Sequence, residues 1–178
     1  MRLFKLFFIS ITILFLVVTA ISLLFPSDVR ISKAINMAAS AGKIISHISD
    51  PAKWKDWYPG LDSARYFYPQ DDMLDPGGVK GFIMKDSSRQ FINMIENKND
   101  EVITEIQSGE KKIISGWKTI SYPHTDSTTL QWYMDFHLRW YPWEKFRSLL
   151  FEPTYGPRME KGLNNIKKLV EANRASIN

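Results

Sequence analysis

The chain has 178 residues, no cysteine and a formal net charge of +4, from 23 basic and 19 acidic residues. Arg2 and Lys5 precede an apolar N-terminal run, so the rest of the chain has 21 basic and 19 acidic residues, which excludes the strongly basic surface of a nucleic-acid-binding protein. The lack of cysteine also excludes a lipid anchor on an N-terminal cysteine.

Residues 6–25 form a run of twenty residues without a charge. A helix of this length, at ~1.5 Å per residue, can cross a hydrocarbon core of roughly 30 Å. The basic residues before the run predict, by the positive-inside rule, that the N-terminus is cytoplasmic and the rest lies outside, although Arg30 and Lys33 follow the run. We therefore expect residues 1–26 to be an uncleaved signal anchor of a single-pass membrane protein.

A cleaved secretory signal is the alternative interpretation of this run. Val18-Thr19-Ala20 has the small-residue spacing that signal peptidase accepts, and cleavage there would release a secreted protein. A cleavable apolar region usually has about 7 to 15 residues, whereas this run continues to Phe25. Its length therefore favours the anchor.

Residues 27–178 are predicted to form one domain, because about 150 residues are enough to bury a hydrophobic core. Apolar and polar residues alternate over residues 29–37, which predicts a strand directly after the anchor. Ser40 is placed to cap a short helix, and Asp50-Pro51 to begin a second one that Pro59-Gly60 ends. Trp54 and Trp57 of the second helix are expected to pack the two short helices rather than to contact a ligand.

Residues 64–141 predict an antiparallel meander of strands separated by tight turns. The predicted turns are Asp75-Pro76-Gly77-Gly78, Lys85-Asp86-Ser87-Ser88, Asn97-Lys98-Asn99-Asp100, Ser108-Gly109 and Pro123-His124-Thr125-Asp126. The clearest strand is the last, because it alternates strictly. One face is predicted to carry Leu130, Trp132, Met134, Phe136, Leu138 and Trp140.

The C-terminal region has a helical pattern from Pro142 onward. A longer helix is expected after Pro153 and Gly156-Pro157, with an apolar stripe of Met159, Leu163, Ile166, Leu169 and Val170. The order of elements predicts an α+β fold in which a curved antiparallel sheet of about six or seven strands wraps around the long C-terminal helix.

Two segments of the chain carry a family resemblance. They are Asp50 followed by Trp54-Lys55-Asp56-Trp57-Tyr58-Pro59, and Tyr155-Gly156-Pro157-Arg158-Met159-Glu160-Lys161-Gly162-Leu163 followed by Ile166-Lys167. With the order of elements, they resemble the START-like helix-grip (SRPBCC) superfamily, and within it the polyketide cyclase/dehydrase and lipid-transport branch. The resemblance covers roughly residues 28–172. It implies a hydrophobic cavity between sheet and C-terminal helix for lipids, polyketides or other apolar ligands, with catalysis in only some members.

The ligand-binding residues that we expect come from the last strand, its neighbour and the long helix, because apolar side chains between a curved sheet and a helix can line a void. They are Trp117, Leu130, Trp132, Met134, Phe136, Leu138, Met159, Leu163 and Ile166. The alternative is that these side chains pack together as a closed core.

Catalytic patterns are sparse in this sequence. The histidines are His47, His124 and His137, and no nucleophile elbow or phosphate-binding glycine loop occurs. Asp135, His137 and Arg139 share one strand face, but that face is opposite the apolar one, which favours solvated ion pairs over catalysis. No third metal ligand is indicated by spacing, so we expect neither a metal site nor a cofactor.

The leading hypothesis is a membrane-anchored binding protein that holds a small hydrophobic ligand. Its expected partners are that ligand and the membrane, with no nucleic acid. An enzyme of cyclase, dehydratase or hydrolase type and a ligand-free interaction module are the alternatives. An enzyme needs polar side chains inside the cavity, and an interaction module needs an exposed apolar patch over a closed core.

Overall fold

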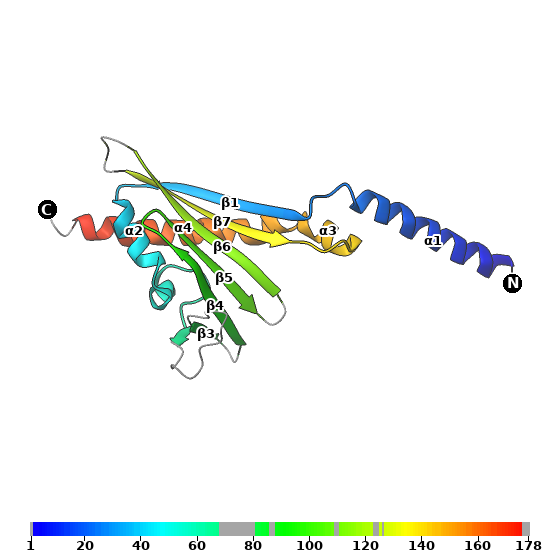
Figure 1. The fold of residues 1–178 in the computed structure, drawn as a ribbon, viewed down its shortest axis with the longest axis horizontal. Coiled ribbons are helices and arrows are strands. Elements are labelled where there is room, and N and C mark those ends of the chain that lie inside the picture. The colour runs from blue at the N-terminus through cyan, green and yellow to red at the C-terminus, as the bar shows by residue number, and fades with distance from the viewer. Residues whose placement is uncertain are drawn as a thin grey trace.

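The computed structural model describes residues 2–67, 81–85, 88–108, 111–122, 125 and 127–175. Helix α1 (Arg2–Ser22) projects away from the rest of the chain (Figure 1), and almost all of its side chains are exposed. The helix is long and apolar enough to cross a membrane. Thr12 and Thr19 donate their hydroxyls to the carbonyls of Phe8 and Phe15, so these polar groups are satisfied within the helix.

Seven antiparallel strands form one sheet, in the order β1-β7-β6-β5-β4-β3-β2. They are β1 (Asp28–Met37), β2 (Arg65–Phe67), β3 (Gly81–Lys85), β4 (Ser88–Asn97), β5 (Glu101–Ser108), β6 (Lys111–Ser121) and β7 (Thr128–His137). The strands β2 to β7 follow one another as a meander, and β1 pairs with β7 along its whole length. This confirms the predicted antiparallel sheet and its size.

The helices α2 (Ala41–Ile48), η1 (Pro51–Asp56), α3 (Pro142–Ser148) and α4 (Phe151–Ala175) complete the fold. The long helix α4 runs behind β1 and β7 in Figure 1, and these elements are in contact. The two predicted short helices are present, and η1 is a 3₁₀ helix. Asp50 caps η1 by accepting a hydrogen bond from the Ala52 amide at 3.0 Å, whereas the Ser40 side chain makes no capping bond to α2.

Two predicted boundaries near the C-terminus are wrong. Helix α4 begins at Phe151, before both prolines, rather than after Pro157. Pro153 lies in the first turn, where a backbone N–H has no helical partner in any case, so it does not delay the helix. Strand β7 ends at His137, and Trp140, predicted on its apolar face, is exposed beyond it. The predicted turns at residues 75–78, and residues 86, 87, 109, 123, 124 and 126 of the others, lie outside the described residues.

The contact between the sheet and α4 is close at two glycines of α4. A side chain at Gly162 would meet the Trp132 indole of β7 at 2.7 Å, and one at Gly156 would meet the Lys33 side chain of β1 at 3.2 Å. Lys33 forms ion pairs with Glu152 and Glu160 at 2.7 and 2.9 Å, which join β1 to two sites of α4 about two turns apart. The glycines therefore allow the helix to lie against the first and last strands.

Candidate ligand-binding cavity

A buried cluster of five aromatic residues fills the space between η1, the sheet and α4. Its members are Trp54, Trp57, Tyr58, Trp117 and Trp132. Their ring centroids are separated by 5.1 to 6.2 Å, within the range of favourable aromatic pairs. The cluster forms one wall of the site and is itself closed.

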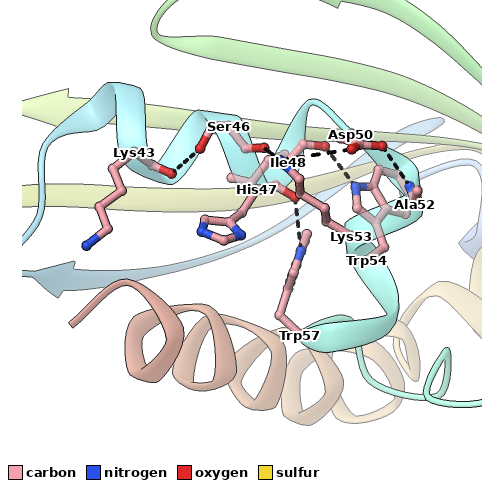
Figure 2. A network of polar contacts seen from close by, with 9 residues as sticks. All are labelled: Lys43, Ser46, His47, Ile48, Asp50, Ala52, Lys53, Trp54 and Trp57. Carbon is pink, nitrogen blue, oxygen red and sulfur yellow. Dashed lines mark hydrogen bonds and ion pairs between the residues drawn. The ribbon is translucent and has the colours of Figure 1, made fainter. Parts of the chain in front are cut away.

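Backbone carbonyls of α2 fix the two indoles of the η1 segment, as Figure 2 shows. Trp54 donates its Nε1–H to the carbonyl of Ile48 at 2.8 Å, and Trp57 donates to that of His47 at 3.2 Å. In β7, Trp132 donates to the Ser115 hydroxyl at 2.8 Å. Trp117 Nε1 is buried without a hydrogen-bond partner among the described residues. Trp54, expected only to pack, both packs in this cluster and lines the cavity described next.

A partly enclosed cavity of about 130 Å³ lies beside the aromatic cluster, between strands β3 to β7 and α4. We call it the inner cavity. Its lining residues are Trp54, Tyr58, Leu61, Ile83, Gln90, Ile92, Ile106, Ile113, Met134, Tyr155 and Arg158. Ile92 pairs with Ile106, and Ile106 pairs with Ile113, so the three isoleucines form a row across β4, β5 and β6. The lining is mostly apolar, with its polar groups on Tyr58, Gln90, Tyr155 and Arg158.

An open recess of about 420 Å³ adjoins the inner cavity. We call it the outer recess. It is lined by Pro59, Gly60, Leu61, Gln90 and Arg158, and the last three of these also line the inner cavity. A second recess of about 340 Å³ lies on the other side of Leu61 and Ile83, against η1 and β2. The inner cavity alone is smaller than the ~300–1,000 Å³ of typical ligand pockets, whereas the outer recess is within that range.

Arg158 marks the junction between the inner cavity and the outer recess. Its Nε donates to the Pro59 carbonyl at 3.1 Å, and its guanidinium carbon lies 5.1 Å from the centroid of the Tyr58 ring. Gly60 has a φ of +85°, and a side chain there would lie 3.4 Å from Arg158 Nη2. The Pro59-Gly60 turn thus holds the cation against Tyr58, and no carboxylate among the described residues forms an ion pair with it.

The Tyr58 phenol is buried against this cation. Burial raises its pKa above the ordinary value, and the positive charge of Arg158 opposes that shift. The phenol is therefore neutral over the physiological pH range. Its hydroxyl has no hydrogen-bond partner within the described part of the chain, so it keeps a donor and an acceptor for a bound molecule.

All nine sequence-predicted lining residues are buried, but the structure divides them between cavity and core. Met134 lines the inner cavity. Phe136 packs on Phe151 and Tyr155, with centroid distances of 4.5 and 4.9 Å. Six others pack in the closed core: Trp117, Leu130, Trp132, Met159, Leu163 and Ile166. Leu138 is buried just beyond the end of β7, outside this core cluster.

The sequence analysis missed the cavity wall formed by β3 to β6, together with Tyr58, Leu61 and Arg158. The predicted turns were a usable signal for the wall, because tight turns fix the register of successive strands and so place Ile92, Ile106 and Ile113 opposite one another. Tyr155 and Arg158 both occur in the segment that carries the family resemblance.

The outer face of the sheet contains ion pairs that involve Asp135 and His137. Asp135 accepts two hydrogen bonds from Arg30 at 2.6 and 2.7 Å, and His137 Nδ1 lies 2.7 Å from Asp28 Oδ1. Arg139, predicted on the same face, lies beyond the end of β7, and its backbone amide donates to Glu144. No group of three or more acidic or histidine side chains that could hold a metal ion occurs among the described residues.

Known proteins share both the sequence pattern and the fold of this chain. The family described as polyketide cyclase/dehydrase and lipid transport matches residues 28–171. No curated protein matches the sequence.

Three solved structures illustrate the shared fold. Norcoclaurine synthase from Thalictrum flavum is 18% identical, over 80% of this chain and 93% of that one, with a TM-score of 0.55. The Zhui aromatase/cyclase from Streptomyces sp. R1128 is 12% identical, over 81% and 94%, with a TM-score of 0.55. A START superfamily protein from Mycobacterium smegmatis is 21% identical, over 80% and 97%, with a TM-score of 0.51. At these identities the likeness extends to the fold alone.

Proposed function

We propose that this chain, which belongs to the polyketide cyclase/dehydrase and lipid transport family, binds a small apolar ligand in the inner cavity and the outer recess. The observation that carries the proposal is a row of three isoleucines, one from each of three strands, that faces a partly enclosed space instead of filling it. Transfer of apolar groups from water into such a space gains ~0.8 kcal/mol per methylene. Six methylenes would contribute about 5 kcal/mol on the same scale.

Arg158 supports a more specific ligand class, an apolar molecule with an anionic head. The guanidinium is at the junction of the two spaces and is not neutralised by a carboxylate among the described residues. A carboxylate or phosphate in the outer recess would receive charge-assisted hydrogen bonds from it. The apolar part of the same molecule would then extend into the inner cavity, past the neutral phenol of Tyr58.

Helix α1 supports the membrane part of the proposal. It is exposed and apolar along its length, and five residues separate it from β1. We propose that it is retained as the anchor, that the cytoplasmic side holds the N-terminus, and that residues 27–178 form the ligand-binding domain outside the cytoplasm. An apolar ligand would then be taken from, or delivered to, the adjacent bilayer.

The test uses the full chain in lipid nanodiscs with a dansyl-labelled undecanoic acid as fluorescent probe. We expect saturable binding, displacement by dodecanoate, and weaker displacement by dodecanol, which has no charge. Empty nanodiscs measure the partition of the probe into lipid. Equal displacement by dodecanoate and dodecanol would overturn the anionic-head class, and the absence of saturable binding would overturn ligand binding itself.

Two matched pairs of variants test the location of the site. Ile113→Trp fills the inner cavity and is expected to abolish binding, whereas Ile120→Trp makes the same change at an exposed position of the same strand and should leave it intact. Arg158→Gln should reduce the preference for dodecanoate over dodecanol, and Lys168→Gln, at an exposed position of the same helix, should not. Far-ultraviolet circular dichroism checks that each variant is folded.

An enzyme of cyclase or dehydratase type is the second candidate, because Tyr58, Tyr155 and Arg158 bring two phenols and a cation to one apolar cavity. The phenols could donate a proton to a ligand carbonyl, and the guanidinium could stabilise the same oxygen by hydrogen bonds. If Tyr58→Phe abolishes turnover of an aromatic polyketide substrate while the probe still binds, the enzyme is the better description. Unchanged turnover in this variant would remove Tyr58 from such a role.

A further inference from the structure

The segment around α3 exposes four large apolar side chains within eleven residues. The exposed fractions are 62% for Trp140, 61% for Trp143, 59% for Leu149 and 62% for Leu150. Tyr141 lies between the two indoles, with centroid distances of 4.8 Å to each. Single exposed apolar residues are common on soluble proteins, but a contiguous group of this size marks a contact surface. We call these five residues the aromatic patch.

The aromatic patch is beside the end of the apolar helix. Figure 1 shows α3 at the end of the molecule from which α1 projects, and α1 and α3 are in contact. The buried Lys145 of α3 donates hydrogen bonds to the Phe25 carbonyl at 3.2 Å and to the Ser27 hydroxyl at 2.8 Å. Phe146 packs edge-on against Phe25, with centroids 5.5 Å apart. These contacts fix α3 to the short connection between α1 and β1.

The composition of the aromatic patch matches one partner, the headgroup region of a lipid bilayer. Tryptophan and tyrosine concentrate at that depth because each combines an apolar ring with a polar hydrogen-bonding group. Two exposed arginines, Arg139 and Arg147, flank the patch and suit anionic headgroups. The acidic residue between them, Glu144, already accepts a hydrogen bond from the Arg139 amide.

We propose that α3 and the aromatic patch lie in the headgroup region of the same bilayer that α1 crosses, as a second membrane contact of the chain. This inference rests on the proposed anchoring by α1. Two contacts, one spanning and one interfacial, would fix the orientation of the ligand-binding domain on the membrane surface, whereas a span alone leaves it free to rotate and tilt.

Intrinsic tryptophan fluorescence provides the test, because the other four tryptophans, Trp54, Trp57, Trp117 and Trp132, are buried. The full chain is reconstituted into phosphatidylcholine vesicles with a quarter phosphatidylglycerol, with and without lipids brominated near the top of the acyl chain. We expect strong quenching by the brominated lipids. The double variant Trp140→Phe/Trp143→Phe should lose most of the quenchable emission, whereas Trp57→Phe, a buried control, should retain it.

Alkaline carbonate extraction of the same vesicles separates this proposal from the anchoring on which it rests. Protein that stays in the membrane and is quenched by brominated lipids supports both. Protein that stays in the membrane without quenching, and whose exposed tryptophans are quenched by aqueous acrylamide, overturns the second contact and leaves the anchor. Protein that carbonate releases overturns both.

Discussion

Gly116 of β6 lies directly opposite Tyr133 of β7, and the phenol ring of Tyr133 occupies the space where a side chain at residue 116 would be. A Cβ atom at Gly116 would lie 2.1 Å from Tyr133 Cζ. The ring also lies beneath the Arg30 guanidinium, at 4.3 Å from the ring centroid, and its hydroxyl donates to Glu101 at 3.1 Å. One missing side chain thus allows a tyrosine to connect three strands on the outer face of the sheet.

Gly116→Ala should destabilise the fold, because the methyl group would displace a ring that is held on both sides. Overpacking of this kind costs typically ~1–3 kcal/mol. Gly42→Ala is the matched control: no atom lies within 4 Å of a Cβ at that position, and alanine in a helix should add up to about 1 kcal/mol of stability. Urea unfolding of the detergent-solubilised chain measures both, and equal effects of the two changes would contradict the role of Gly116.

Stability should fall as the pH rises through the ionisation of Tyr133. Burial, followed by the hydrogen bond to Glu101, raises the pKa of Tyr133 to about 12 from an ordinary value of 10.0. The folded state therefore keeps a proton that the unfolded state loses, so this contribution is complete below pH 10 and is lost as the pH rises through about 12.

Tyrosinate absorbance, taken as the difference between the wild type and Tyr133→Phe, measures this pKa. Glu101→Gln should lower it, because a neutral acceptor no longer opposes the negative charge of tyrosinate. If the pKa of Tyr133 in the folded protein equals that of the exposed tyrosines, the predicted loss of stability at high pH is contradicted.

Lys145→Met should loosen the junction between α1 and the sheet. The Phe25 carbonyl and the Ser27 hydroxyl would lose a charged donor, and a hydrogen bond to a charged group contributes ~1.5–3 kcal/mol. Hydrogen exchange followed by mass spectrometry should show faster exchange in α3 and in residues 23–27. Lys168→Met, at an exposed position of α4, should change neither segment.

A reporter enzyme that is active only outside the cytoplasm should be active when fused after Asn178, because Arg2 and Lys5 predict, by the positive-inside rule, a cytoplasmic N-terminus. Intact mass of the membrane-extracted protein should include α1. A mass that begins at Ile21 would make the chain a secreted protein, and a reporter active only in the cytoplasm would reverse the orientation.

The sequence was sufficient to predict the elements whose signal is local. Strict alternation in β7 and the paired turn residues on either side of β5 are properties of short segments, and both predicted strands. The predicted start of α4, after Pro157, is wrong because neither Pro153 nor Pro157 interrupts the helix. A proline in the first turn of a helix removes no hydrogen bond, so Pro153 does not indicate where α4 begins.

The cavity wall could be predicted only in part, because it depends on which way the sheet curves. Strict alternation in β7 identifies the apolar face of that strand. It does not show which side chains on that face pack in the closed core, as Leu130 and Trp132 do, and which line the cavity, as Met134 does. The position of Arg158 depends on the Pro59-Gly60 turn, which is about a hundred residues away in the chain. No pattern among residues close together in the sequence predicts a contact of this kind.

The pairing of β1 with β7 has a consequence for biosynthesis. Asp28 of β1 pairs with His137 of β7 in the sheet. The ribosome therefore synthesises α1 and β1 long before the partner strand β7. The other support of β1, α4, is synthesised later still. The strands from β2 to β7 can pair in the order of their synthesis, whereas β1 remains an unpaired edge that is prone to pairing with other chains until the last third of the protein is made. Nascent chains of this protein therefore expose a strand edge beside α1 for most of their elongation, which is when chaperone protection would matter most.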